Sequence, residues 1–230
     1  MSSRGALLLP RIITLLLIML AFAATIVVYP ELPSEMASHW NAAGEADGFS
    51  AKGLSTFFVP ILMVGLAGLM WAVPFIDPLR KNVEVFRLEY EWFIAVMTAF
   101  FLVIQAQILL WNLGYEISPN VVLPISMSVL YIYIGWMLGR ARRNFFIGIR
   151  TPWTLMSEEV WDKTHRLGGI LFIMAGVITL LGALMPEYSV WFTLVPVLIA
   201  TAVTVVYSYV LYQRVGPDKG PGEQVIPPAP

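Results

Sequence analysis

Long uninterrupted runs of apolar residues, separated by short polar segments, are the main pattern of this chain. Each run approaches the roughly 20 residues that a helix needs to cross the hydrocarbon core of a bilayer. The runs are continuous rather than alternating, which predicts helices and not a membrane barrel. The predicted fold class is therefore all-α, a polytopic membrane protein. Its six transmembrane helices are expected at residues 10–29, 54–75, 90–113, 119–138, 168–185 and 190–212.

The first run could also be a secretory signal peptide. It is long for the apolar core of a signal, and Val27, Val28 and Tyr29 stand where cleavage would require small residues. We therefore interpret it as a retained helix.

The composition agrees with a membrane protein and excludes several kinds of site. Hydrophobic residues make up 58% of the chain and charged residues only 13%, which is not the composition of a soluble domain. The chain has no cysteine, so disulfides, thiolate catalysis and Cys-based metal sites are excluded.

Positive charges are distributed very unevenly between the two sides that six spans create. Lys52 falls on one side, and the other thirteen of the fourteen Lys and Arg fall on the opposite side. Because basic loops stay in the cytoplasm, we predict a multi-pass protein of the cytoplasmic membrane with both termini inside. Membrane lipids are the expected partners of this basic rim, and no direct nucleic-acid partner is predicted. The thirteen residues are Arg4, Arg11, Arg80, Lys81, Arg87, Arg140, Arg142, Arg143, Arg150, Lys163, Arg166, Arg214 and Lys219.

Three regions are expected along the chain. Residues 1–75 form a two-helix N-terminal region with an extracytoplasmic loop at 30–53. Residues 76–215 form a four-helix region with a cytoplasmic interfacial segment at 139–167. Residues 216–230 are rich in Pro and Gly and are predicted to be disordered.

Polar residues near or within the spans give further expectations. The third helix is predicted to extend into the cytoplasm from about Val83. Gln105 and Gln107 are interpreted as hydrogen-bonding partners between helices. The spans contain no ionisable residue near their middle, which disfavours a transporter.

The inner segment 139–167 concentrates most of the chain's chemistry. Ser157, followed by Glu158 and Glu159, predicts a helix start, because a hydroxyl caps free amides and acids favour the positive end of the helix dipole. Gly168 and Gly169 allow a bend or a close approach. Upstream, the largely apolar run 144–149, followed by two tryptophans that favour headgroup depth, predicts a partly inserted interfacial hairpin. These tryptophans are Trp153 and Trp161.

Several interpretations of this segment stay open. Arg150 beside the hydroxyls of Thr151 and Thr154 suits a phosphate or carboxylate. Glu158, Asp162 and His165, spaced i, i+4 and i+7, could bind a metal, or Asp162 and His165 could supply a general base. The alternative is an interfacial helix whose charges pair with one another and with lipid. No catalytic residue, metal or cofactor is assigned.

The outer loop is the second concentration of polar and aromatic residues. Its pair Asp47 and Gly48 predicts a tight turn in a small folded loop. A metal site at His39, a turn anchored by aromatic residues, and a recognition surface for an extracellular peptide are the three interpretations. The recognition candidates are His39, Trp40, Asn41, Asp47 and Lys52.

These motifs together resemble the SdpI family of membrane immunity proteins. The run IGIRTPWT at 147–154, EEVW at 158–161 and THRLGG at 164–169 is similar to the family signature, within an SdpI-like region at 76–215. The loop at 32–52 is similar to the small domain that often precedes it. The resemblance favours a functional site at the motif positions present here, which are Arg150, Thr151, Pro152, Trp153, Thr154, Trp161, Thr164, His165 and Arg166.

The resemblance implies a prokaryotic membrane protein that protects against a pore-forming or membrane-perturbing peptide. It also implies two partners, a secreted peptide toxin and a cytoplasmic transcriptional repressor that is held at the membrane. The leading hypothesis is therefore an immunity and signal-transduction protein. The alternatives are an enzyme or binder acting on a phosphorylated lipid or small anion at the inner interface and, least favoured, a small transporter.

Overall fold

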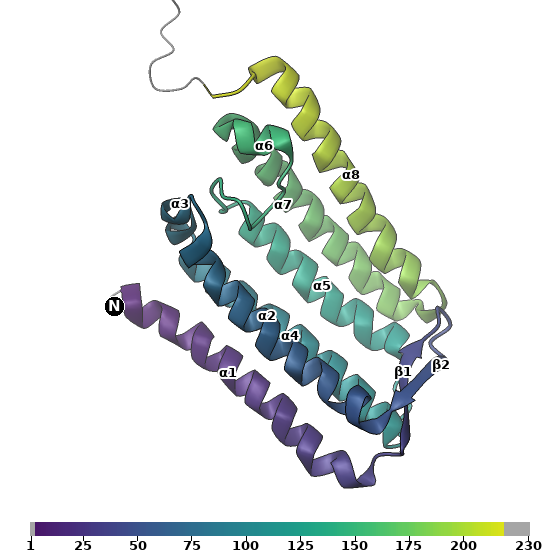
Figure 1. Ribbon diagram of the computed structural model, residues 1–230. Coiled ribbons are helices and arrows are strands. Elements are labelled where there is room, and N and C mark those ends of the chain that lie inside the picture. The colour runs from purple at the N-terminus through teal and green to yellow at the C-terminus, as the bar shows by residue number, and fades with distance from the viewer. Residues whose placement is uncertain (1–2, 219–230) are drawn as a thin grey trace, which may run out of the picture.

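The computed structural model describes residues 3–218, which form a bundle of long helices with one small β-hairpin (Figure 1). The strands are β1 (Glu35–Trp40) and β2 (Ala46–Ala51). Six helices are long and apolar enough to cross a membrane, which confirms the predicted number of spans. The helices are α1 (Ser3–Val28), α2 (Lys52–Ile76), α3 (Arg80–Val85), α4 (Arg87–Asn112), α5 (Pro119–Leu138), α6 (Pro152–Met156), α7 (Glu158–Leu181) and α8 (Ser189–Val215).

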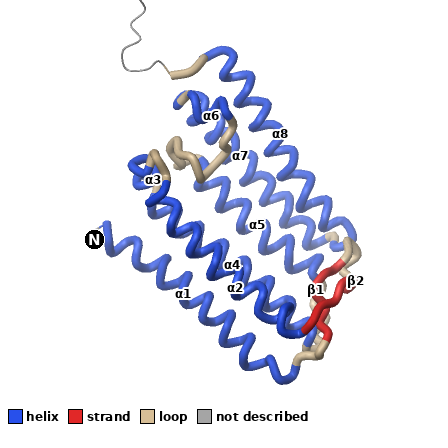
Figure 2. The backbone as a smooth tube through the Cα atoms, in the orientation of Figure 1, coloured by secondary structure: helices blue, strands red, loops and turns tan. Residues whose placement is uncertain are grey.

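The six long helices form two groups of three. Helices α1, α2 and α4 pack on one another, as do α5, α7 and α8, and α4 packs against α5 to join the groups. The β-hairpin covers one end of the bundle, called the hairpin end. The beginning of α1, the end of α8, α3 and α6 all lie at the other end, called the basic end (Figure 2).

One helix start agrees with the sequence prediction and one differs from it. Helix α7 begins at Glu158, as Ser157 predicted, and continues into the fifth span; Ser157 caps its first turn by accepting a hydrogen bond from the Val160 amide. The extension of the third helix from Val83 is interrupted at Phe86, which has φ −116° and ψ 29°. Its side chain is buried in the core, and α4 starts at the next residue.

Glycines allow α5 and α7 to approach closely. A Cβ added to Gly135 would lie 2.5 Å from the Gly169 carbonyl oxygen, and one added to Gly169 would lie 2.8 Å from that of Gly135. Gly176 meets the α5 backbone in the same way. The close approach predicted at Gly168 and Gly169 is therefore confirmed, and α7 continues through both as one helix.

Buried amides connect the N-terminal helices. The Gln105 side chain on α4 donates to the Thr25 hydroxyl on α1 at 2.8 Å and to the Thr56 carbonyl on α2 at 2.9 Å. The interhelical role predicted for Gln105 is confirmed. Gln107 instead donates to the Ile117 carbonyl in the loop after α4.

The outer loop is an antiparallel hairpin, but its turn is not at Asp47 and Gly48. The turn spans residues 41–45, where the Asn41 side-chain oxygen accepts from the amides of Ala43 and Glu45, and Gly44 takes φ +84°. Asp47 and Gly48 lie within β2, at an irregular pairing opposite His39. The Asn41 side chain and the freedom of Gly44 decide the turn.

Candidate functional site

The segment between α5 and α6 is an irregular loop built around Asn144 and not a regular hairpin. The fully buried Asn144 side chain donates to the carbonyls of Arg142 and Ile147 and accepts from the amides of Phe146 and Ile147. One amide side chain therefore satisfies four backbone groups of the loop. A buried side chain whose hydrogen bonds are all formed in this way fixes the conformation of the loop.

The same loop is fastened to the connection between α2 and α4. Buried Asp77 accepts from the Phe145 amide at 2.9 Å and from the Leu79 amide at 2.6 Å. Asn82 on α3 donates to the Arg143 carbonyl at 2.8 Å. The loop therefore links the two groups of helices at the basic end.

His165 sits inside the structure and holds the loop through its ring nitrogens. Its Nε2 accepts from the Ile149 amide at 3.0 Å, so that nitrogen carries a lone pair. Its Nδ1, 2.9 Å from the Trp161 carbonyl, then carries the proton. The ring also stacks on the Trp161 indole with centroids 3.9 Å apart. Gly148 takes φ +113°, and a Cβ there would collide with His165 Nε2.

Thr151 and Thr154 are structural capping residues in this arrangement. Thr151 begins α6 with a capping box that includes Thr154, and its hydroxyl lies 3.1 Å from that of Ser208 on α8. Thr154 also donates to the Ile149 carbonyl at 2.8 Å. Trp153 packs edge-on against Tyr209. Both threonine hydroxyls are thus buried and engaged, and neither is free beside Arg150.

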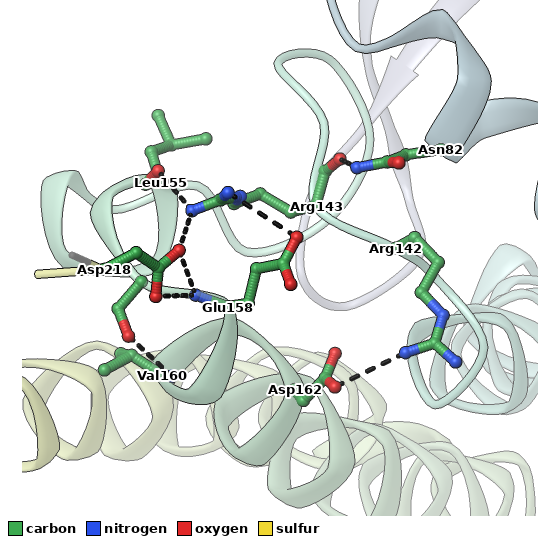
Figure 3. Close-up of polar contacts among 9 residues, drawn as sticks. Asn82, Arg142, Arg143, Leu155, Glu158, Val160, Asp162 and Asp218 are labelled. Atoms are coloured by element: carbon green, nitrogen blue, oxygen red, sulfur yellow. Dashed lines mark hydrogen bonds and ion pairs between the residues drawn. The ribbon is translucent and has the colours of Figure 1, made fainter. Parts of the chain in front are cut away.

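The beginning of α7 carries an ionic cluster that includes the last described residue (Figure 3). Asp218 accepts from the Glu158 amide at 3.0 Å and from Arg143 at 2.6 Å. Arg143 also lies 3.5 Å from the Glu158 carboxylate. The sequence placed Asp218 in a disordered tail, but here it caps a helix; residues 219–230 of that predicted tail lie outside the described residues.

The structure separates the three residues considered for a metal or a general base. Asp162 is exposed and lies 3.4 Å from Arg142 (Figure 3). Both nitrogens of buried His165 bond to the backbone. Glu158 lies with Arg143. The alternative in which Asp162 and His165 act together as a general base finds no support in these contacts, because each side chain bonds to other partners. Within residues 3–218, no three His, Asp or Glu side chains gather as a metal site.

The remaining inner candidates lie in different surroundings. Arg150 is exposed and donates to the Phe145 carbonyl at 2.8 Å. Arg166 is exposed and forms no ion pair within residues 3–218. The Thr164 hydroxyl is buried without a hydrogen-bond partner in that part of the chain.

Two hollows meet at this loop. An apolar crevice of about 470 Å³ lies between α2, α4 and α5 and includes Tyr90, Phe93, Phe146 and Arg150 in its lining. A second hollow of about 330 Å³, the arginine cavity, is lined by Arg140, Arg142, Arg166, Glu89, Asp162 and His165 among others. Gly148 and Ile149 line the crevice, and His165, which bonds to Ile149, lines the cavity. The loop and His165 therefore form the partition between them.

The outer candidates are spread along the hairpin, from its turn at Asn41 to the start of α2 at Lys52. His39 and Asp47 pair at 2.5 Å on its exposed face, and Trp40 packs edge-on against Trp111 of α4. Lys52 donates to the Leu32 carbonyl and lies over the Tyr29 ring. Together with Asn41 in the turn, these side chains chiefly shape the hairpin, and His39 and Asp47 are the exposed pair.

Comparisons with known proteins match both polar regions. Residues 140–208 match the SdpI/YfhL protein family, and residues 16–64 match a domain of unknown function, DUF1648. The chain is 27% identical over 205 residues to Immunity protein SdpI of Bacillus subtilis (strain 168), covering 89% of this chain and 96% of that protein. The chain is therefore similar to the SdpI/YfhL family over residues 140–208 and to this relative over most of its length. No solved structure matches it.

The SdpI/YfhL match coincides with the site at the basic end. It runs from Arg140, in the arginine cavity, to Ser208, which contacts Thr151 across the loop. It therefore includes the loop, α6, α7 and most of α8. The DUF1648 match includes the β-hairpin at the opposite end.

The sequence analysis missed a buried ionic cluster that joins α1, α2 and α4. Glu91 on α4 is 1% exposed and accepts from Arg11 on α1 at 2.5 Å, Arg87 at 3.0 Å and the Trp71 indole on α2 at 3.0 Å. Glu84 also pairs with Arg87. The spacing of Arg87 and Glu91 along one helix was visible, but the contribution of α1 was not.

Proposed function

We propose that this protein is an immunity protein of the cytoplasmic membrane that protects its cell from a membrane-active peptide. The observation that carries the proposal is the similarity to Immunity protein SdpI, which extends along 89% of this chain and 96% of that protein. A match of this extent includes both polar ends of the bundle. It is therefore not confined to the apolar helices, which can look similar between unrelated membrane proteins because of their composition alone.

The proposed orientation puts the basic end in the cytoplasm and the hairpin outside. The loop between α5 and α6 and the first part of α7 carry half of the arginines, and the others also lie toward the basic end, whereas the hairpin region contributes Lys52 alone. Basic loops are retained on the cytoplasmic side. In this orientation a secreted peptide meets the hairpin first.

The contacts of the hairpin support a sensing role. Asn112 on α4 bonds to both the amide and the carbonyl of Ala37, at 2.8 and 3.0 Å, and Asn120 on α5 donates to the Ala42 carbonyl at 2.9 Å. The hairpin is thus attached to each of the two helices that join the groups. A peptide bound to the hairpin would bias how α4 and α5 pack, and a change between two packings would reach the loop and α7. Recruitment of a cytoplasmic repressor by the exposed first turns of α7 is part of this proposal.

A growth assay tests the function directly. The chain is expressed in a bacterium sensitive to membrane-active peptides, which is then challenged with a panel of secreted peptides. We expect protection against at least one of them. Arg150→Ala and His165→Phe should reduce protection, and Arg214→Ala, an exposed basic residue on α8 outside both hollows, should not.

Membrane abundance of each variant is measured by immunoblotting. Equal survival of cells with and without the protein across the panel would reject the immunity function. Full protection by both Arg150→Ala and His165→Phe would instead remove the basic end from the mechanism. A pull-down from cells exposed to the protective peptide tests whether a repressor is recruited.

A further inference from the structure

The arginine cavity has the composition of an anion site at the membrane surface. Arg140, Arg142 and Arg166 contribute three guanidinium groups, against the two carboxylates of Glu89 and Asp162. These residues come from α4, from the loop after α5 and from α7, so the cavity is formed by three elements and is not a stripe along one helix.

The three guanidinium groups form only long ion pairs, or none, with carboxylates of the described residues. Arg140 lies 3.9 Å from Glu89, and Arg142 lies 3.4 Å from Asp162. These separations are longer than the roughly 2.8 Å of a strong charge-assisted hydrogen bond. Arg166 has no ion-pair partner within residues 3–218. Most N–H donors in the cavity are therefore free to bind an anion.

One of the arginines is held in position by its neighbours. Arg140 stacks on the Trp136 ring, with its guanidinium carbon 3.9 Å from the ring centroid, and donates to the Trp136 carbonyl at 3.0 Å. His165 lines the cavity but has both nitrogens bonded to the backbone, so it supplies a wall and no donor. The positive charge in the cavity thus comes from arginine alone, and arginine forks match phosphate oxygens.

The location of the cavity indicates which phosphate it meets. It lies where α5 ends and α7 is in its second turn, at the basic end. Exposed Trp136 stacks against Arg140 beside it, and tryptophan favours the level of the lipid headgroups. We propose that the arginine cavity binds one phosphate group, supplied by the headgroup of an anionic phospholipid. This binding does not depend on the proposed immunity function.

The test titrates the full chain, in a neutral detergent, with short-chain phosphatidylglycerol by calorimetry. Parallel titrations use inorganic phosphate and a short-chain diacylglycerol without phosphate. We expect saturable binding of phosphatidylglycerol, weakened about tenfold in Arg166→Gln and in Arg142→Gln, because each removes a charge-assisted contact. Arg214→Gln, on the same end but outside the cavity, should bind as wild type.

Asp162→Asn provides a variant that cannot be mistaken for misfolding. It removes a carboxylate that competes for Arg142, so phosphatidylglycerol should bind about threefold more tightly. Inorganic phosphate that binds with the same pattern of variants would support the site and show that the free anion is also a ligand. Equal weakening in Arg214→Gln and Arg166→Gln, equal binding of diacylglycerol, or no saturable binding would overturn the proposal.

Discussion

At the scale of single residues, the loop at the basic end depends on one glycine. Gly148 combines φ +113° with a position where a Cβ would enter the space of His165 Nε2. Substitution Gly148→Ala therefore forces either an unfavourable backbone or the loss of the bond between His165 and the Ile149 amide. We expect the free energy of unfolding to fall by about 1–3 kcal/mol. Denaturant titration in detergent micelles, followed by circular dichroism, measures it.

Gly65 offers the matched control for this substitution. It lies inside α2, with no heavy atom within 4 Å of an added Cβ. Gly65→Ala should be neutral or slightly stabilising, because alanine favours the helix. If Gly148→Ala unfolds with the same free energy as Gly65→Ala, the loop does not rely on the contact between Gly148 and His165.

Residue type and spacing predicted only part of this site. Ser157 as a helix cap follows from a local rule and is confirmed. The position of His165 could not be predicted. Its i, i+7 spacing from Glu158 indicated a charged helix face, but its ring is buried against Gly148 and bonds to the Trp161 carbonyl. Asp218 escaped prediction because it caps an amide 60 residues away. Contacts between distant parts of the chain leave no local pattern.

At the scale of helices, the pairing of α5 with α7 rests on glycine contacts. Gly135→Leu would place a side chain where the Gly169 carbonyl stands, only 2.5 Å from the new Cβ. Packing between membrane helices relies on such close approach. We expect a loss of about 3 kcal/mol in the free energy of unfolding, measured by titration with a denaturing detergent.

The control for this helix contact is Gly68→Leu on α2. An added Cβ at Gly68 meets no heavy atom within 4 Å, so this variant gains the same side chain without a collision. Similar unfolding of the two variants would mean that leucine itself, and not the contact with α7, causes the change.

The packing of α1 against α4 involves the buried carboxylate of Glu91. Glu91→Gln removes the charge that pairs with Arg11 and Arg87. Because breaking a buried ion pair leaves charges unpaired, the free energy of unfolding should fall by about 3–5 kcal/mol. Glu84→Gln, whose side chain is 60% exposed and contacts the same Arg87, should cost less than about 1 kcal/mol. The same detergent titration distinguishes them, and equal losses would contradict a special role for the buried cluster.

At the scale of the whole molecule, the two groups of helices are bridged at both ends. The hairpin contacts α4 and α5 through Asn112 and Asn120 at one end. The loop after α5 contacts Asp77 and Asn82 at the other. Polar contacts between distant segments, here called the polar clamps, therefore lie at both ends of the contact between α4 and α5. The apolar crevice lies beside the clamp at the basic end. The helix number could be predicted from apolar runs, but these clamps could not, since each joins segments far apart in sequence.

The orientation of this bundle in the membrane is the broadest prediction. The chain has no cysteine, so single cysteines can be introduced without background, at exposed Ala43 in the hairpin turn and at exposed Lys81 on α3. Because basic segments stay in the cytoplasm, a membrane-impermeant maleimide should label Ala43→Cys in intact cells and Lys81→Cys only after permeabilisation. Both variants must label fully in detergent, which establishes that each thiol is reactive. Labelling of Lys81→Cys alone in intact cells would place the arginine cavity outside. The hairpin would then face the cytoplasm, where it could not be the first contact for a secreted peptide.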